Sequence, residues 1–154
     1  IRALIPNSPI VDLHAYMTSF VGFDPAQMPD TDDFRVADID HLPPALMTPQ
    51  QRQMSRNLIL RLGCESFKAA YVRLRDFRVG ERELARITCP SLALAGAGEG
   101  KGPLAQFERF CQSVSGPVTS HLFTAEEGAD GHCQTGNLAY SAAVSMDWLD
   151  EVFS

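Results

Sequence analysis

The chain has 154 residues, of which 45% are hydrophobic and 21% are charged, and these values are ordinary for one globular domain. Its formal net charge of −6 argues against nucleic acid as a partner, because a nucleic-acid-binding domain usually carries a basic face. No apolar run approaches the roughly 18 residues that a membrane span needs, so we expect no membrane partner.

The N-terminal part predicts one strand and then little regular structure. Ile1–Ile5 is a short apolar run that ends at the tetrapeptide PNSP, and this pattern predicts a buried strand followed by a turn. Residues 10–47 are rich in Asp and Pro and show little periodicity. We expect them to form one short helix and much loop.

Two helices are predicted in the middle of the chain. Thr48 can cap the first helix, Pro49 suits its first position, Gln51 completes a capping box and Gly63 can end it. The second helix is expected to end at Gly80. Their apolar stripes, which we expect to face the core, are Met54, Leu58 and Leu62 in the first helix, and Phe67, Tyr71, Leu74 and either Phe77 or Arg78 in the second.

The last third alternates between strands and helices. Ser91–Ala95 and Val118–Thr124 are typical of strands, a helix is expected from Pro103 to a break at Gly116, and a final helix follows the loop at Ala125–Thr135. This order predicts a parallel sheet with helices packed on it. The stripes of the two helices are Leu104, Phe107, Cys111 and Val114, and Val144, Trp148 and Val152.

Neither the glycine-rich loop after Ala95 nor the Cys and His residues indicate a cofactor. The Walker A motif fails because Ala95 stands at its first glycine and Gly102 follows Lys101, and a dinucleotide motif starting at Gly96 fails at Lys101. The cysteines form no C-x-x-C pair and the histidines no H-x-x-x-H pair. We expect no metal, no cofactor, and reduced thiols in a cytoplasmic location.

Two polar residues stand where functional groups collect in an open α/β sheet. Glu99 follows the first predicted strand of the last third, and His132 lies in a glycine-punctuated loop after the second. Because the carboxyl ends of parallel strands meet at one edge of a sheet, the histidine could act as a general base beside the acid. We predict that the imidazole and the carboxylate lie about 2.6–3.2 Å apart, with Asp130 as the competing acid.

This order of strand, acid, helix, strand, loop and histidine resembles the C-terminal half of the α/β-hydrolases. The segment ITCPSLALAG at 87–96 resembles the entry to their penultimate strand, and Glu99 stands where the family carries its triad acid. The segment GADGHCQ at 128–134 resembles the loop of the triad histidine, and Trp148–Glu151 resembles the closing helix. The NSP turn at 7–9 resembles the branch that includes 2,6-dihydroxypseudooxynicotine hydrolase and the fungal polyketide-shortening hydrolases.

The resemblance implies the C-terminal part of an α/β-hydrolase parallel sheet with an inserted helical cap. It divides the chain into a core strand and turn at 1–11, a helical cap at 12–86, and a core with the triad acid and histidine at 87–154. The family's G-x-S-x-G nucleophile motif is absent from the sequence, so the serine is expected in an N-terminal half that precedes Ile1. Without that half, one sheet edge would stay unpaired, and the chain is expected to aggregate or bind hydrophobic dyes.

The resemblance also implies a serine-type mechanism on a small-molecule carbonyl substrate, either an ester or a carbon–carbon bond next to a ketone. A serine from the N-terminal half would attack the carbonyl, His132 would take its proton and then protonate the leaving group, and Glu99 would orient His132. The alternatives are a non-hydrolytic acyltransferase or cyclase, a catalytically inactive relative, and a Rossmann-type binding domain. A cysteine in the upstream elbow would favour acyl transfer.

Charge is unevenly distributed along the chain. The local balance is −5 over residues 1–47, +5 over 48–87 and −6 over 88–154. A basic segment of this kind is typical of solvated helix faces, or of a surface that meets an acidic neighbour or an anionic substrate. The resemblance adds a homodimer through the cap as a further partner. The arginines expected at such a contact are Arg52, Arg56, Arg61, Arg73, Arg75 and Arg78.

Overall fold

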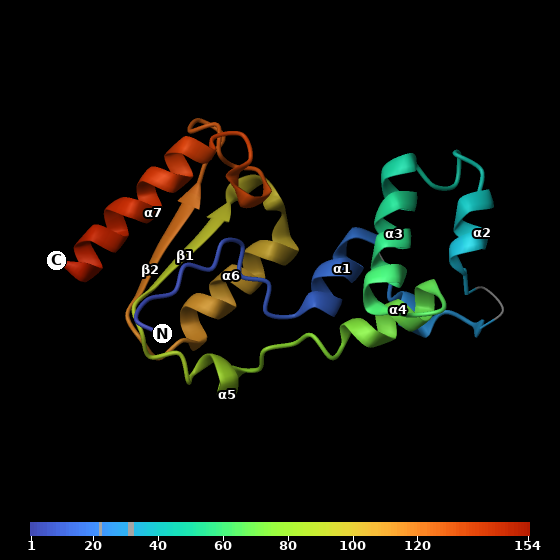
Figure 1. Ribbon diagram of the computed structural model, residues 1–154, viewed down its shortest axis with the longest axis horizontal. Helices are drawn as coiled ribbons and strands as arrows, with labels where there is room; N and C mark the ends of the chain where they lie inside the picture. Colours follow the sequence, from blue (N-terminus) through green and yellow to red (C-terminus); the bar gives the residue numbers. More distant parts are fainter. Residues whose placement is uncertain (22, 31–32) are drawn as a thin grey trace. The chain divides into compact units, whose positions relative to one another are not determined.

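The computed structural model describes residues 1–21, 23–30 and 33–154, and the chain divides into two compact units (Figure 1). The first unit comprises Ile1–Asp12 and Val79–Ser154, and the second comprises Leu13–Arg78. No helix in these described ranges is long and apolar enough to cross a membrane. The first unit contains α5 (Glu81–Leu84), β1 (Ser91–Gly96), η3 (Ala97–Glu99), α6 (Lys101–Ser113), β2 (Val118–Phe123), η4 (His132–Gln134) and α7 (Leu138–Phe153). The second contains α1 (Leu13–Val21), η1 (Pro25–Gln27), α2 (Val36–His41), α3 (Pro49–Leu62) and α4 (Phe67–Leu74).

Among the described residues, two parallel strands form the sheet of the first unit. Strand β1 pairs with β2 in a register that sets Ser91 opposite Val118 and Gly96 opposite Phe123. Helix α6 is the crossover between them, because parallel neighbours cannot be joined by a short hairpin. The predicted order of strand, helix, strand and helix is therefore confirmed, and both strands end at the same edge of the sheet.

The core of the first unit lies on both faces of β1, which is buried along its whole length. Successive side chains of a strand point to opposite faces, so one apolar strand can hold two helices. On one face, Ala93 and Ala95 pack with Phe107 and Phe110 of α6. On the other, Leu92 and Leu94 pack with Phe123 of β2 and Trp148 of α7. This packing fixes the carboxyl ends of both strands.

The segment Ile1–Ile5 does not form the regular strand that its composition predicts. Residues 1–7 run parallel to β1 and pair with it only through two isolated bridges, Leu4 with Ser91 and Asn7 with Leu94. Pro6 interrupts the ladder because proline has no N–H to donate, although its carbonyl accepts a bond of 3.0 Å from the N–H of Leu94. The N–H of Ser8 then donates to the carbonyl of Leu94 at 2.7 Å, so Ser8 lies beside the carboxyl end of β1.

The prediction for the start of α3 is confirmed in detail. Thr48 accepts a hydrogen bond from the N–H of Gln51, whose side chain accepts one from the N–H of Thr48, and Gly63 ends the helix with φ of +63°. The predicted stripe is confirmed in part, because Leu58 and Leu62 pack against the core of the helical unit and Met54 does not. The residues of α3 buried in the helical unit are Ser55 and Ile59, while Leu58 and Leu62 are partly buried and Met54 is exposed.

Two further predictions for the helical unit are wrong. Residues 10–47 contain two α-helices, α1 and α2, rather than one. Helix α4 ends at Leu74 rather than near Gly80. The N–H groups of residues 75–77 each donate to the carbonyl three residues back, whereas an α-helix uses the carbonyl four residues back. Phe67, Tyr71 and Leu74 are buried as predicted, whereas Phe77 lies beyond the helix and is exposed.

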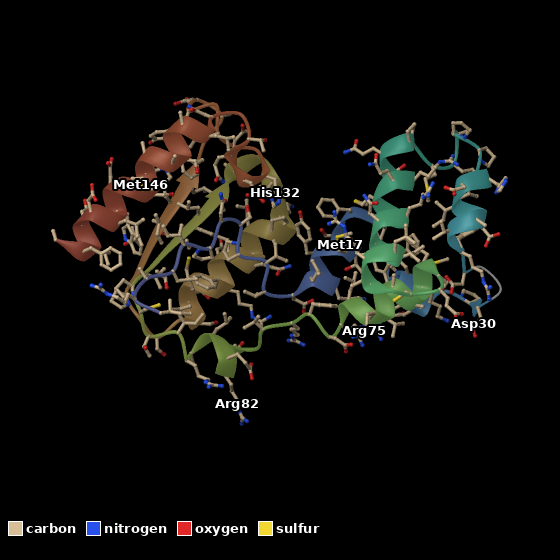
Figure 2. All side chains as sticks on the ribbon, viewed as in Figure 1. Met17, Asp30, Arg75, Arg82, His132 and Met146 are labelled. Atoms are coloured by element: carbon tan, nitrogen blue, oxygen red, sulfur yellow. The ribbon has the colours of Figure 1, made fainter. Side chains whose placement is uncertain are left out.

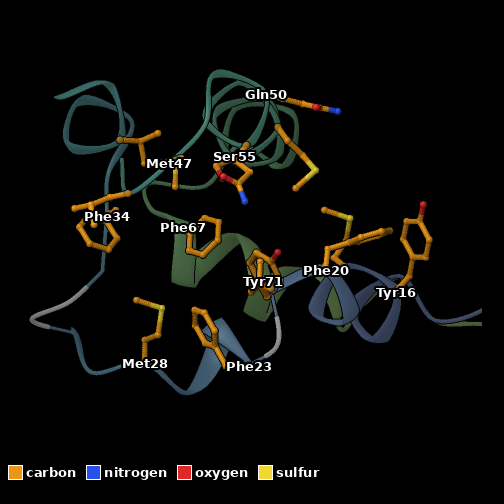
Figure 3. Close-up of a pocket in the computed structure, with 16 residues that line it drawn as sticks. Tyr16, Phe20, Phe23, Met28, Phe34, Met47, Gln50, Ser55, Phe67 and Tyr71 are labelled. Carbon is orange, nitrogen blue, oxygen red and sulfur yellow. The ribbon is translucent and has the colours of Figure 1, made fainter. Parts of the chain in front are cut away.

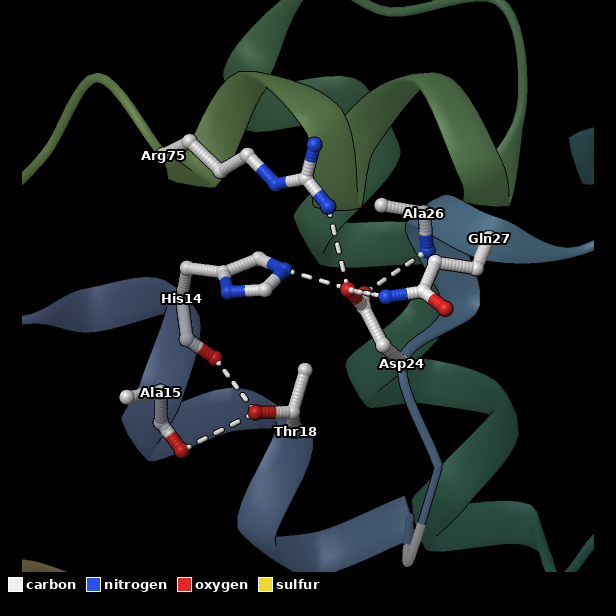
Figure 4. A network of polar contacts seen from close by, with 7 residues as sticks. All are labelled: His14, Ala15, Thr18, Asp24, Ala26, Gln27 and Arg75. Carbon is white, nitrogen blue, oxygen red and sulfur yellow. Dashed lines mark hydrogen bonds and ion pairs between the residues drawn. The ribbon is translucent and has the colours of Figure 1, made fainter.

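A polar network around Asp24 ties the helical unit together (Figure 4). The Asp24 carboxylate accepts bonds from His14 Nε2 at 3.0 Å, the Arg75 guanidinium at 3.0 Å, the Ala26 N–H at 3.0 Å and Gln27 Nε2 at 3.2 Å. Burial acts to raise the pKa of Asp24, but the bonds from Ala26, His14 and Arg75 outweigh it and hold the pKa below its ordinary value. The ionised carboxylate thereby links α1, the η1 turn and the residue that follows α4.

Candidate active site

The structure brings the two candidate residues of the sequence together at the carboxyl edge of the sheet. Glu99 ends the turn after β1, and His132 follows β2 at the start of η4 (Figure 2). His132 Nδ1 lies 2.7 Å from Glu99 Oε2, a distance within the predicted range. The Glu99 side chain is 1% exposed and that of His132 is 54% exposed, so the acid is enclosed and the base is accessible.

Three donors converge on the buried Glu99 carboxylate. Oε1 accepts the Gly96 N–H at 2.8 Å and the Ser8 hydroxyl at 2.6 Å, and Oε2 accepts from His132. Burial acts to raise the pKa of Glu99, but the hydrogen bonds from Gly96, His132 and Ser8 outweigh it and hold the pKa below its ordinary value. Glu99 is therefore ionised at neutral pH.

The ionised state of Glu99 fixes the chemistry of the histidine. A carboxylate only accepts hydrogen bonds, so His132 Nδ1 must carry the proton of their bond, and Nε2 becomes the basic nitrogen of the neutral ring. A basic Nε2 on an imidazole that is oriented through Nδ1 can take a proton from a hydroxyl nucleophile. The pair can therefore supply the acid and the base of a catalytic triad.

Ser8 is the residue of this site that sequence reasoning missed. Its place in a turn without a neighbouring glycine argues against a nucleophile elbow, and the sequence indicates no other role. The structure shows its hydroxyl donating to Glu99, which makes Ser8 a positioning group for the acid. The NSP turn at 7–9 is the signal that could have indicated Ser8. The chain before this turn runs parallel to β1, so the turn lies at the same edge of the sheet as Glu99.

Backbone strain is concentrated around the Glu99–His132 pair. Among the described residues, the non-glycine residues with positive φ are Ser8 at 53°, Cys133 at 54° and Gln134 at 52°. Such conformations cost about 1–3 kcal/mol each and collect at functional sites, where the surrounding structure holds them. Here they turn the Ser8 hydroxyl toward the acid and set the direction of the loop that carries His132.

Cys133 is a potential nucleophile beside His132, but its environment disfavours the thiolate. Burial raises the pKa of the Cys133 thiol, and the negative charge of Glu99 raises it further. Since the thiolate is the reactive form of cysteine, a neutral thiol next to His132 is a weak nucleophile.

Close backbone approach explains two of the glycines. The N–H of Gly98 donates to the carbonyl of Asp130 at 2.9 Å, which ties the loop of the acid to the loop of the histidine. A Cβ on Gly96 would collide with the Asp130 carbonyl, and one on Gly98 would lie 2.7 Å from Asp130 Oδ2. The competing acid Asp130 thus lies against the Gly96–Gly98 turn.

Arg52, Arg56, Arg73 and Arg75 of the basic segment have partners inside the helical unit. Arg52 donates to the carbonyls of Asp40 and Leu42, and three ion pairs are present. These join Arg56 to Asp40, Arg73 to Asp76 and Arg75 to Asp24, each at 3.0 Å. The contacts support the folded unit, and a homodimer through this surface stays a prediction. No group of three or more metal-ligating side chains that could hold an ion is present in the described ranges.

Comparison with solved structures finds remote structural likeness. No family model and no curated protein matches the chain. The chain is similar to the MenH structure from S. aureus, an α/β-hydrolase-fold enzyme, with 16% sequence identity and a TM-score of 0.47. The alignment covers all of this chain and 60% of the MenH chain. The function proposed below rests on the geometry of the chain itself.

Proposed function

We propose that this chain supplies the acid and the histidine of a serine-type α/β-hydrolase. The observation that carries the proposal is the 2.7 Å contact between His132 Nδ1 and Glu99 Oε2, made by two loops that follow neighbouring parallel strands. A buried ionised acid behind an accessible imidazole is the arrangement that activates a hydroxyl nucleophile. The specific branch of hydrolases, and the action of residues 12–86 as a cap, belong to the same proposal.

The reaction follows from the roles of the two residues. A serine from a G-x-S-x-G segment outside residues 1–154 attacks the substrate carbonyl, and its proton passes to His132 Nε2 as the carbon–oxygen bond forms. Glu99 stabilises the resulting imidazolium, which then protonates the leaving group: the alkoxide of an ester, which departs as the alcohol, or the carbanion next to a ketone. Water attacks the acyl-enzyme with the same proton transfers and releases the acid product.

Fluorophosphonate labelling of the full-length protein tests this proposal. A triad serine should form a covalent adduct with the probe, and the labelled peptide should lie outside residues 1–154. The variant His132→Ala should abolish labelling because no base remains to activate the serine, whereas His41→Ala, at an exposed histidine of α2, should label normally. An unlabelled full-length protein, or a label on Ser8, would show that the roles are assigned wrongly.

The positioning role of Ser8 gives a second prediction. Loss of its hydroxyl removes one of the bonds that lower the pKa of Glu99, so this pKa should rise in Ser8→Ala. The loss of a hydrogen bond to a charged group costs about 1.5–3 kcal/mol, so kcat should fall about tenfold or more with little change in KM. Carbon-13 NMR titration of the Glu99 carboxyl group measures the shift.

A second variant separates the hydroxyl of Ser8 from its strained backbone. Ser8→Gly also lacks the hydroxyl but accepts positive φ without strain, so it should unfold at a higher temperature than Ser8→Ala. Both variants should raise the pKa of Glu99 equally. An unchanged Glu99 pKa in either variant would leave Ser8 with a structural role alone.

A further inference from the structure

The helical unit contains a cavity of about 620 Å³ that the proposed reaction does not use (Figure 3). All of its described lining residues lie between Tyr16 and Tyr71, within the second unit. The volume is in the range of pockets that bind small molecules, about 300–1,000 Å³. The cavity therefore has the size of a ligand site, and the character of its lining decides what it can hold.

The described lining is aromatic, flexible and uncharged. Of its sixteen residues, six are aromatic and four are methionine, and none carries a formal charge. Methionine side chains adapt to irregular apolar surfaces and make favourable contacts with aromatic rings. Several charged groups of this unit are engaged in ion pairs with one another, as are Arg56 with Asp40, Lys68 with Asp30, and Arg75 with Asp24. A charged ligand would lose its hydration here without gaining a partner.

The hydroxyl groups of two buried residues add polarity to this apolar lining. Ser55 is 5% exposed and Tyr71 is 1% exposed, and both residues line the cavity. Burial raises the pKa of Tyr71 to about 12, so its phenol stays protonated and can donate a hydrogen bond. Neither hydroxyl oxygen is among the fully enclosed side-chain atoms that lack a partner in the described part of the chain, so both oxygens are accessible from the cavity. A few polar groups in an apolar pocket are the usual means by which a ligand is oriented.

We propose that this cavity binds a neutral aromatic small molecule that carries a polar group for the hydroxyls of Tyr71 and Ser55. The aromatic rings of Phe20 and Phe23 stand at its exposed side, because they are 54% and 53% exposed, and Phe67 and Tyr71 form its buried wall. Aromatic pairs favour offset or edge-on contacts, so these rings suit a flat ligand. The proposal goes beyond the proposed hydrolysis and does not depend on it, since the described lining of the cavity lies in the helical unit and the Glu99–His132 pair lies in the other unit.

A matched pair of fluorescent probes tests this assignment on the full-length protein. N-phenyl-1-naphthylamine is neutral, and 8-anilinonaphthalene-1-sulfonate has the same ring system with an added sulfonate. We expect saturable one-to-one binding of the neutral probe and binding of the sulfonate that is at least about tenfold weaker. Equal affinity for the two probes, or a fluorescence increase that does not saturate, would overturn the proposal.

Three phenylalanine variants locate the binding. Phe20→Ala and Phe23→Ala should each weaken binding of the neutral probe about tenfold, because each removes one aromatic wall. Both side chains are half-exposed, so their loss should leave the fold intact. The control is Phe77→Ala: it removes a similarly exposed ring of the same unit that does not line the cavity, and it should bind like the original chain. An equal loss of affinity for the neutral probe in all three variants would show that the probe does not bind in this cavity, and the proposal would fail.

The full-length protein separates a ligand from a protein occupant. If residues outside 1–154 fill the cavity, the full-length protein will not bind the neutral probe, and the proposal fails. Saturable one-to-one binding by the full-length protein supports a small-molecule site. Because the readout is binding, inactivity of the protein as a hydrolase leaves this result unaffected.

Discussion

Replacing His132 by alanine should remove turnover of an ester substrate by the full-length protein. In the proposed reaction His132 Nε2 accepts the proton of the serine, and Glu99 holds His132 Nδ1 at 2.7 Å. Loss of the histidine of a serine triad lowers kcat on the order of 10⁶-fold, because the residual rate comes only from binding and the oxyanion hole. Initial rates with a p-nitrophenyl ester measure the loss.

The matched control for this variant is His41→Ala. His41 lies at the end of α2 in the other unit and is exposed, so its loss should change neither kcat nor the melting temperature appreciably. His132→Ala should also fold normally, because more than half of the histidine side chain is exposed. A folded His132→Ala protein with more than about one tenth of the original kcat would exclude His132 as the base.

The sequence predicts the arrangement of the acid and the histidine because that arrangement follows from chain order. β1 and β2 are short strands separated by a helix, and parallel neighbours bring the residues that follow them to one edge of the sheet. Glu99 is the first ionisable side chain after β1, and His132 is the first histidine after β2, so chain order alone predicts that the two lie near one another. The capping box at Thr48 is also predictable from the sequence, because it depends only on hydrogen bonds within four consecutive residues.

Features that depend on contacts distant in sequence are not predictable in this way. Ser8 reaches Glu99 across 91 positions, and its hydroxyl is oriented by a positive φ that no local pattern indicates. The role of Gly96 follows from the approach of Asp130, which belongs to another loop. The buried face of α3 is centred on Ile59 rather than on the predicted stripe, because the neighbouring helices of the unit decide which side is covered.

Glu99→Gln should slow the reaction severely while leaving substrate binding largely intact. A glutamine can offer an N–H rather than a lone pair to His132 Nδ1, which favours the tautomer whose Nε2 carries the proton and cannot act as a base. The corresponding Asp→Asn change in a serine protease lowers kcat about 10⁴-fold, and we expect a loss of that order with KM changed little. Steady-state kinetics of the full-length protein separate the two parameters.

The same variant should change how stability depends on pH. The pKa of Glu99 is lower in the folded protein than its ordinary value, so ionised Glu99 stabilises the fold above that ordinary value. This contribution is lost as the pH falls through the folded pKa, where the carboxylate becomes protonated. The melting temperature of the Gln variant should therefore lie below that of the original protein above about pH 5, and the difference should shrink in acid.

Two carboxylate variants decide whether Glu99 is the acid of the pair. Asp130→Asn removes the competing carboxylate two positions from His132, and Glu127→Gln removes one whose bonds are to Thr124 and Tyr140. Both should keep kcat within about tenfold of the original, because neither group supplies the 2.7 Å contact to Nδ1. A crippled Asp130→Asn beside an active Glu99→Gln would instead assign Asp130 as the acid. The argument from strand ends would then fail, because Asp130 belongs to the histidine's own loop and not to the turn after β1.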